Sequence, residues 1–134
     1  MNILVIDDEP LILNLLKRTI SQSGHSVSLA KNGAEALALV KTQNFDLILT
    51  DMWLADSSAL ELLNQLKNFC LKIVLMSGSY PQDTLQNHKE ISHVLMKPFS
   101  IKDILAILQE IQRQLPILNP SPRITPIEIK ESNN

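Results

Sequence analysis

The sequence predicts an α/β domain in which helices cover both faces of a parallel β-sheet. Short apolar segments recur along the chain, and segments with apolar residues every three to four positions lie between them. The apolar segments are nearly continuous, which is typical of strands buried on both faces. Strict alternation of strand and helix indicates parallel strands joined by right-handed crossovers. Strands are expected at residues 3–6, 27–29, 47–49, 73–76 and 93–96.

The first helix is expected directly after the first strand. Pro10 suits the first helical position, where its missing N–H costs nothing, and Gly24 suits the turn that ends the helix. Residues at helical spacing predict one buried side. They are Leu11, Ile12, Leu15, Leu16, Thr19 and Ile20.

Two further helices are expected at residues 33–41 and 57–68. Each has apolar residues three to four positions apart, which predicts one face packed on the sheet. The inward residues are expected to be Leu37 and Val40 in the first, and Leu60, Leu63 and Leu66 in the second.

The last two helices differ in apolar content. Residues 81–90 contain Leu85 as their one strong apolar residue, so a short fourth helix with little core is expected. Ser100 and Asp103 form a capping pair that opens the fifth helix, and Pro116 stops it. The stripe of the fifth helix comprises Ile101, Ile104, Leu105, Leu108 and Ile111, and Ile107 widens it beyond one core face.

The composition limits the class of protein. A chain of 134 residues with 45% hydrophobic content fits one domain, and a net charge of -2 with scattered basic residues argues against nucleic-acid binding. No segment approaches the ~20 apolar residues of a membrane span. The single cysteine, Cys70, fits a reducing compartment, so a cytoplasmic location is expected. Four prolines after residue 115 indicate a folded domain at 1–115 and an extended, Pro-rich tail or linker at 116–134.

Side chains that can carry chemistry follow four of the five expected strands. The first strand is followed by Asp7 and Asp8, the third by Asp51, the fourth by Ser77 and the fifth by Lys97. Because the carboxyl ends of parallel strands share one edge of the sheet, these side chains are expected to converge there.

Three carboxylates in one place repel one another and stay ionised only beside a cation. Mg²⁺ commonly takes one or two carboxylates together with water and phosphate oxygens. Asp51 could then act as a nucleophile that forms an aspartyl phosphate, while Lys97 and Ser77 contact the phosphoryl oxygens. Each residue alone also fits an ordinary role as a helix cap or a solvated charge, so the joint placement carries the prediction.

Four motifs contain these residues. They read Val5-Ile-Asp-Asp-Glu-Pro10, Asp46-Leu-Ile-Leu-Thr-Asp51, Met76-Ser-Gly78 and Met96-Lys-Pro-Phe99. Through them the sequence resembles the response-regulator receiver domains of two-component signalling over residues 1–115. The resemblance implies a doubly wound, flavodoxin-like receiver fold with strand order 2-1-3-4-5 and five flanking helices.

The resemblance also implies a role for each site residue. Asp51 would accept the phosphoryl group, Ser77 and Lys97 would contact it, and the Lys97–Pro98 peptide bond would be cis. The ligands of Mg²⁺ (or Mn²⁺) would be Asp8, Asp51, Asp7 mainly through water, and the backbone carbonyl of Trp53.

The function implied by the resemblance is that of a signalling phosphoacceptor, which catalyses only its own phosphorylation and dephosphorylation. A sensor histidine kinase or a phosphotransfer protein would supply the phosphoryl group. The signal is expected to leave through altered protein contacts. Because the fourth helix has little core and Ile107 widens the stripe of the fifth, a second copy or an effector is expected to meet the face between these two helices. Nucleic acid and membrane are not expected as direct partners.

The chain departs from the family pattern at three places. Ala55 and Ala59 stand where Pro and Gly are usual, and Val94 stands where a switch Tyr or Phe usually lies. The stretch from Ser77 to Lys97 is slightly shorter than is common, which again predicts an abbreviated fourth helix.

Two other functions stay open at this point. A degenerate receiver would bind partners without phosphorylation, and the missing switch aromatic at Val94 is compatible with that function. A haloacid-dehalogenase-like phosphatase also combines an Asp nucleophile with Mg²⁺. Such an enzyme would need an acid two residues after the nucleophile, where this chain has Trp53.

Overall fold

The computed structural model describes residues 1–54, 56, 59–69 and 72–115, and leaves the side chains of residues 59 and 60 undescribed. The expected tail at 116–134, the expected helix start at Ser57, the departure at Ala55 and Cys70 therefore lie outside the described residues. The same holds for the side chains of Ala59 and Leu60.

The strands form one parallel sheet in the order β2-β1-β3-β4-β5, which confirms the expected fold class and strand order. All five expected strands are present, each slightly longer than its apolar segment. Their bounds are β1 (Asn2–Ile6), β2 (Ser26–Ala30), β3 (Leu47–Asp51), β4 (Lys72–Ser77) and β5 (Ile91–Met96).

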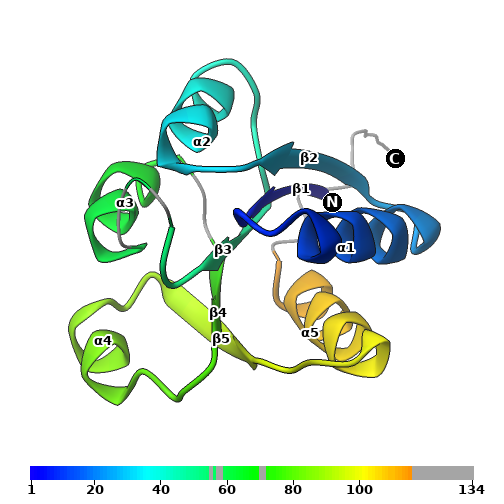
Figure 1. The fold of residues 1–134 in the computed structure, drawn as a ribbon. Coiled ribbons are helices and arrows are strands. Elements are labelled where there is room, and N and C mark those ends of the chain that lie inside the picture. The colour runs from blue at the N-terminus through cyan, green and yellow to red at the C-terminus, as the bar shows by residue number, and fades with distance from the viewer. Residues whose placement is uncertain (55, 57–58, 70–71, 116–134) are drawn as a thin grey trace, which may run out of the picture.

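Helices cover both faces of the sheet (Figure 1). One face carries α1 (Pro10–Gln22) and α5 (Ile101–Gln114). The other carries α2 (Gly33–Val40), α3 (Ala59–Leu66) and α4 (Gln82–Asn87). Among the residues that the structure describes, no helix has the length and apolar character required to cross a bilayer.

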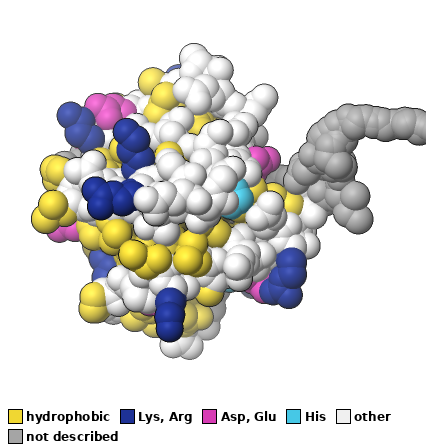
Figure 2. All heavy atoms as spheres, turned by 90° about the vertical axis from the view of Figure 1, so that its right-hand side faces the viewer, with side chains coloured by type: hydrophobic (Ala, Val, Ile, Leu, Met, Phe, Trp, Pro, Cys, Tyr) yellow, Lys and Arg dark blue, Asp and Glu magenta, His cyan; other side chains and the backbone are white. Residues whose placement is uncertain are grey.

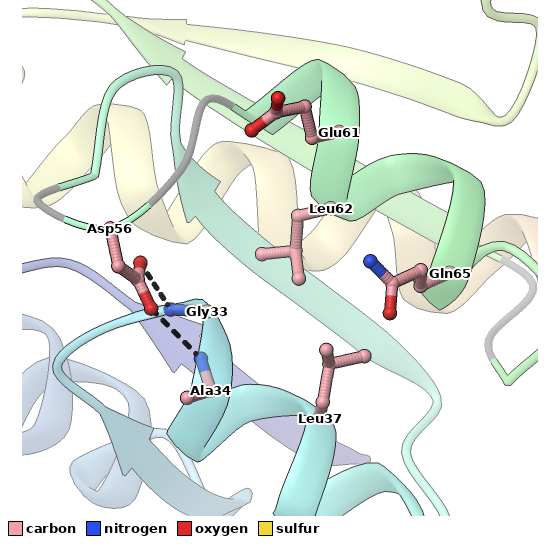
Figure 3. A pocket seen from close by; sticks show the side chains of 7 residues that line it. All are labelled: Gly33, Ala34, Leu37, Asp56, Glu61, Leu62 and Gln65. Carbon is pink, nitrogen blue, oxygen red and sulfur yellow. Dashed lines mark hydrogen bonds between the residues drawn. The ribbon is translucent and has the colours of Figure 1, made fainter.

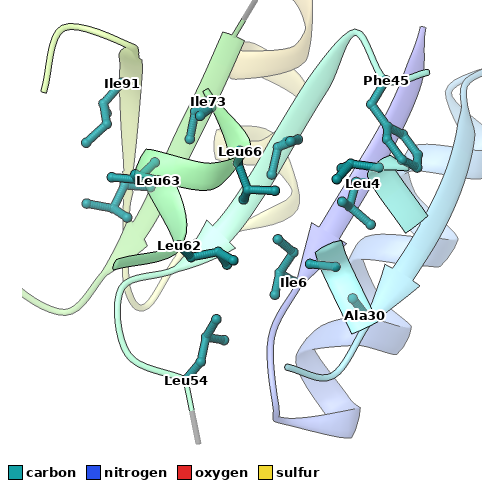
Figure 4. Close-up of a cluster of buried hydrophobic side chains, with 14 residues drawn as sticks. Leu4, Ile6, Ala30, Phe45, Leu54, Leu62, Leu63, Leu66, Ile73 and Ile91 are labelled. Carbon is teal, nitrogen blue, oxygen red and sulfur yellow. The ribbon is translucent and has the colours of Figure 1, made fainter. Parts of the chain in front are cut away.

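The sheet divides the hydrophobic core into two clusters, because successive side chains of a strand point to opposite faces. Leu4 and Ile6 of β1 pack under α2 and α3, whereas Ile3 and Val5 pack under α1 and α5. Figure 4 shows the first cluster, with Leu62, Leu63 and Leu66 of α3 lying over the strands. Each fully buried Leu or Ile contributes about 1.5–3 kcal/mol, so the strands are held firmly at the positions that carry the site.

Helix α1 begins at Pro10 and is followed by Gly24 in the left-handed region (φ +90°), as predicted. Its buried side differs from the prediction. Leu11 is 83% exposed, whereas Leu13, which was not predicted, is buried. Two residues advance a helix by roughly 200°, so Leu11 and Leu13 lie on opposite sides. The stripe that faces the sheet is therefore Leu13, Leu16, Thr19 and Ile20, with Ile12 and Leu15 half-buried at its border.

Helices α2, α3 and α4 agree with their apolar patterns. Val40 is buried and Leu37 is half-buried in α2, although the small residue Ala36 was not predicted to contribute. Within the described residues α4 spans six residues and buries none of them, which confirms the short fourth helix. Leu85 packs partly against the first cluster and is the main apolar contact that α4 makes.

Helix α5 begins with the predicted capping box. The Asp103 N–H donates to Ser100 Oγ at 3.2 Å, and the Ser100 N–H donates to Asp103 Oδ2 at 2.8 Å. Ile107 corrects an expectation, because it is half-buried and packs against the second cluster. Ile107 therefore contributes to the packing of α5 on the core and does not extend the apolar stripe past that contact. Ile101 is the stripe residue that stays mostly exposed, at 53%.

Removal of the Ser100 hydroxyl should destabilise the domain. The variant Ser100→Ala loses the acceptor for one first-turn N–H of α5, so the free energy of unfolding should fall by about 1 kcal/mol in urea denaturation. Ser21→Ala, which changes an exposed serine near the end of α1, is the matched control and should shift it by less than about 0.5 kcal/mol. Equal effects of the two substitutions would contradict the importance of the cap.

Candidate functional site

The register of the sheet brings the predicted residues together. Ile6 of β1 pairs with Thr50 of β3, so the next residues, Asp7 and Asp51, lie at the same level of the sheet edge. The Asp7 N–H also donates to the carbonyl oxygen of Ala30 at 3.1 Å, which ties the end of β1 to the end of β2. The carboxyl edge of the sheet therefore holds both acids in fixed positions.

Asp7, Asp8 and Asp51 form the expected acidic cluster. Each offers one carboxylate oxygen, and these oxygens lie within 4.8 Å of one another. Asp7 is buried, Asp51 is half-buried and Asp8 is exposed, so the cluster opens to solvent on one side. Oxygen ligands at such separations fit a hard divalent cation that keeps several coordination positions for water or a bound anion. The carboxylates present therefore fit a divalent cation such as the predicted Mg²⁺.

Lys97 lies against this cluster. Its Nζ is 3.2 Å from Asp51 Oδ1 and 3.5 Å from Asp7 Oδ2. The backbone helps to place it, since the Lys97 N–H donates to the carbonyl oxygen of Ser77 at 2.7 Å. The Lys97–Pro98 peptide bond is cis, as predicted. One ammonium group thus compensates two of the three carboxylates.

The protonation equilibria follow from this arrangement. Burial raises the pKa of Asp7 above its ordinary value, although the hydrogen bond from the Glu9 N–H (2.9 Å) and the charge of Lys97 oppose the effect. Burial by itself would lower the pKa of Lys97, but the charges of Asp7 and Asp51 outweigh it and raise that pKa. The ammonium group therefore stays charged at neutral pH.

Ser77 lies at the end of β4, next to the position paired with Asp51, but its hydroxyl is engaged locally. Ser77 Oγ donates to the carbonyl oxygen of Ser79 at 2.6 Å and accepts from the Ser79 N–H at 3.2 Å. It also lies 3.5 Å from Met52 Sδ. A phosphoryl group at Asp51 would have to compete with these partners for the Ser77 hydroxyl.

The structure also describes Trp53 and Val94, two residues to which the sequence drew attention. The Trp53 side chain is 64% exposed two residues after Asp51, while the neighbouring Leu54 is buried. Val94 is half-buried in β5 and pairs with Leu75. Metal binding by the Trp53 carbonyl stays a prediction.

Two features of this edge were not predicted. The carboxylate of Asp56 accepts hydrogen bonds from the N–H groups of Gly33 and Ala34 at the start of α2. No local pattern could have indicated a contact between residues 22 and 23 positions apart. The second feature is an apolar hollow beside Lys97, lined by Ile12, Leu15, Pro98 and Phe99. Figure 2 shows hydrophobic side chains gathered on this face of the molecule, with Lys and Arg side chains around them.

Comparison with known proteins gives the family. The sequence model of the family described as response regulator receiver domain matches residues 3–109. The alkaline phosphatase synthesis transcriptional regulatory protein PhoP of Bacillus subtilis is 32% identical over 89% of this chain and 51% of its own length. Sporulation initiation phosphotransferase F of Bacillus subtilis is 30% identical over 76% of this chain and 86% of its own length. The chain spans about half the length of PhoP and of the response regulators MprA that it also matches.

Solved structures agree with this result. A two-component response regulator from Clostridium difficile superposes with a TM-score of 0.78 at 26% identity, covering 85% of this chain and 97% of its own. The response regulator TrrA from Thermotoga maritima, determined in complex with Mg²⁺-BeF, gives a TM-score of 0.72 at 26% identity, covering 82% and 97%. Since the family model covers most of the chain and includes every residue of the acidic cluster, the protein belongs to the response-regulator receiver domains of two-component signalling.

Proposed function

We propose that this receiver domain accepts a phosphoryl group on Asp51 in a Mg²⁺-dependent reaction, with a histidine kinase or a phosphotransfer protein as the donor. The observation that carries the proposal is the acidic cluster, whose three carboxylate oxygens lie within 4.8 Å of one another. Lys97 Nζ, at 3.2 Å from Asp51 Oδ1, adds a fixed positive charge where a phosphoryl group would sit. Membership of the receiver family supports the same conclusion.

The metal ligands in this proposal are the carboxylates of Asp7, Asp8 and Asp51, with the Trp53 carbonyl as a further oxygen ligand. Mg²⁺ (or Mn²⁺), when bound, supplies positive charge that offsets the negative charge of the phosphoryl oxygens. Asp7, whose side chain is fully buried, would contribute mainly through a water molecule bound to the metal. The exposed Asp8 lies on the side from which water and the phosphoryl donor enter.

The residues of the chain have separate tasks in the transfer. A carboxylate oxygen of Asp51 attacks the phosphorus atom while the bond from phosphorus to the donor nitrogen or oxygen breaks. Lys97 exchanges its contact with Asp51 for one with a phosphoryl oxygen. Ser77 releases the carbonyl oxygen of Ser79 and donates to another phosphoryl oxygen. The domain thus promotes only its own phosphorylation and dephosphorylation.

The apolar hollow beside Lys97 supports docking of a protein donor. Ile12 and Leu15 of α1, together with Pro98 and Phe99, present half-buried and exposed apolar surface directly next to the site. A partner that covers this hollow would bring its phosphorylated side chain over the acidic cluster. Apolar surface at a functional edge is typical of protein contact sites.

The output in this proposal passes through α4. Val94 has no ring that could rotate into the space vacated by Ser77, so a different element must respond. Helix α4 resists displacement least, since none of its residues is buried and Leu85 is its main core contact. Movement of the loop that carries Ser77 would then change the face between α4 and α5, where a second copy or an effector binds.

The phosphorylation experiment below distinguishes the proposed function from two others. A degenerate receiver would bind Mg²⁺ or partners but take no phosphoryl group. A haloacid-dehalogenase-like phosphatase is disfavoured, because the position two residues after Asp51 holds Trp53, which cannot donate a proton to a leaving group.

Treatment with acetyl phosphate and Mg²⁺ should add the mass of one phosphoryl group to the protein, as measured by intact mass spectrometry. Asp51→Asn should abolish the addition, because the amide is no nucleophile, and removal of Mg²⁺ by a chelator should block it as well. Asp46→Asn is the control, since Asp46 lies at the amino end of β3. A wild-type protein that binds Mg²⁺ and stays unmodified would be a degenerate receiver.

Asp7→Asn should stabilise the metal-free protein at neutral pH. The pKa of Asp7 is raised on folding, so its ionisation opposes folding once the pH exceeds the ordinary value of 3.8. The substitution should raise the free energy of unfolding at pH 7, and the gain should vanish below that ordinary pKa. Urea denaturation across pH measures it. Saturating Mg²⁺ should reverse the gain, whereas a loss of stability without metal would contradict the argument.

The segment 116–134 should be dispensable for phosphorylation, because no proposed ligand lies beyond Lys97. We propose residues 1–115 as the receiver domain and the remainder as a tail or linker. A protein ending at residue 115 should match the full chain in Mg²⁺ affinity and in phosphorylation by acetyl phosphate, with its fold checked by circular dichroism. A folded 1–115 protein that has lost Mg²⁺ binding would place the domain boundary elsewhere.

A further inference from the structure

The carboxylate of Asp56 connects the loop after β3 to the start of α2. One of its oxygens accepts from the Gly33 N–H at 3.0 Å, and the other accepts from the Ala34 N–H at 3.2 Å. Figure 3 shows both bonds crossing from the loop to the first turn of the helix. Asp56 lies five residues after Asp51 in the same loop that carries Trp53.

The first turn of α2 depends on this contact. The Glu35 N–H donates to the side chain of Asn32, and the Ala36 N–H donates to the Asn32 carbonyl oxygen. Asp56 accepts from the two N–H groups that remain, and Gly33 is buried. A carboxylate at this position also interacts favourably with the partial positive charge of a helix N-terminus. The contact therefore supplies acceptors for the two N–H groups of the first turn that Asn32 leaves unpaired.

The start of α2 is in turn fixed to the acidic cluster. It lies three residues after the end of β2, and the Ala30 carbonyl oxygen accepts from the Asp7 N–H at 3.1 Å. Because β2 also pairs with β1 along its whole length, Gly33 and Asp7 belong to one rigid part of the fold. Asp56 thus holds its loop against the same framework that holds Asp7.

Three points fix the described residues of the loop after Asp51. The Met52 N–H donates to the carbonyl oxygen of Met76 at 2.9 Å, and Leu54 is buried in the first core cluster. The carboxylate of Asp56 is the third point. Trp53 lies between the first two, where its backbone forms a β-bridge and its side chain is mostly exposed.

We infer that Asp56 is a positioning residue for the Mg²⁺ site, because it ties the loop that carries the Trp53 carbonyl to the start of α2. This inference rests on the proposed function. Asp56 acts through the backbone, since within the described part of the chain the clustered carboxylates are those of Asp7, Asp8 and Asp51 alone. Groups that hydrogen-bond directly to metal ligands commonly change metal affinity by about 10–100-fold when they are removed, and Asp56, which acts through the backbone, is expected at the lower end of that range.

Mg²⁺ titration of Asp56 variants tests the inference. Calorimetry provides the dissociation constant, and Trp53 fluorescence offers a second readout close to the metal. Asp56→Ala should weaken Mg²⁺ binding by about tenfold, and Asp56→Asn, which keeps one acceptor, should weaken it less. The matched control is Asp46→Asn, because Asp46 Oδ2 also accepts a backbone N–H, from Asn2 at 2.7 Å, but at the opposite edge of the sheet. Its Mg²⁺ affinity should equal that of the wild type.

Hydrogen exchange separates positioning from general destabilisation. In Asp56→Ala the amides of Gly33 and Ala34 should exchange faster, and those of the sheet should not change. If Asp56→Ala does not fold, the comparison of Asp56→Asn with Asp46→Asn decides. Folded Asp56 variants with wild-type Mg²⁺ affinity would overturn the inference while leaving the proposed function intact. A wild-type protein without Mg²⁺ binding would instead overturn the proposed function.

Discussion

Electrostatic repulsion among Asp7, Asp8 and Asp51 is the constraint around which the functional edge is built. Their oxygens lie within 4.8 Å of one another, and Asp7 has no exposure to water that could screen its charge. Lys97 offsets part of the repulsion through contacts of 3.2 and 3.5 Å to Asp51 and Asp7. The remaining negative charge favours a divalent cation at this edge, and in the proposed function the phosphoryl group would bind beside that cation.

Such a cluster can persist only on a framework that is stable for other reasons. The two core clusters provide that stability, because β1, β3 and β4 bury apolar side chains on both faces. The strands then deliver the acids to one edge without any contribution from the acids themselves. Beyond the strands, contacts of one or two hydrogen bonds hold the loops. The Lys97 N–H contact with Ser77 and the Asp56 contact with α2 are two of them.

The sequence predicted the strands and most helix limits correctly, since continuous apolar runs, Pro10, Gly24 and the capping pair at Ser100 are local signals. It was wrong about which side of α1 is buried. Leu11 and Leu13 could each belong to an apolar stripe of the helix, and only the position of the sheet beside α1 decides which of them is buried. Ile107 was misjudged for a similar reason, because the width of the α5 contact depends on how closely α1 lies beside it.

The sequence by itself determined the fold class, the strand order through its family resemblance, and the identity of Asp7, Asp8, Asp51 and Lys97 as a group. The grouping of these four residues follows from their places at strand ends, because the carboxyl ends of parallel strands lie at one edge of the sheet. Only the tertiary structure decided that the Ser77 hydroxyl is held by Ser79 and that Asp56 caps α2. The choice among possible hydrogen-bond partners depends on distances between loops, which no local sequence pattern encodes.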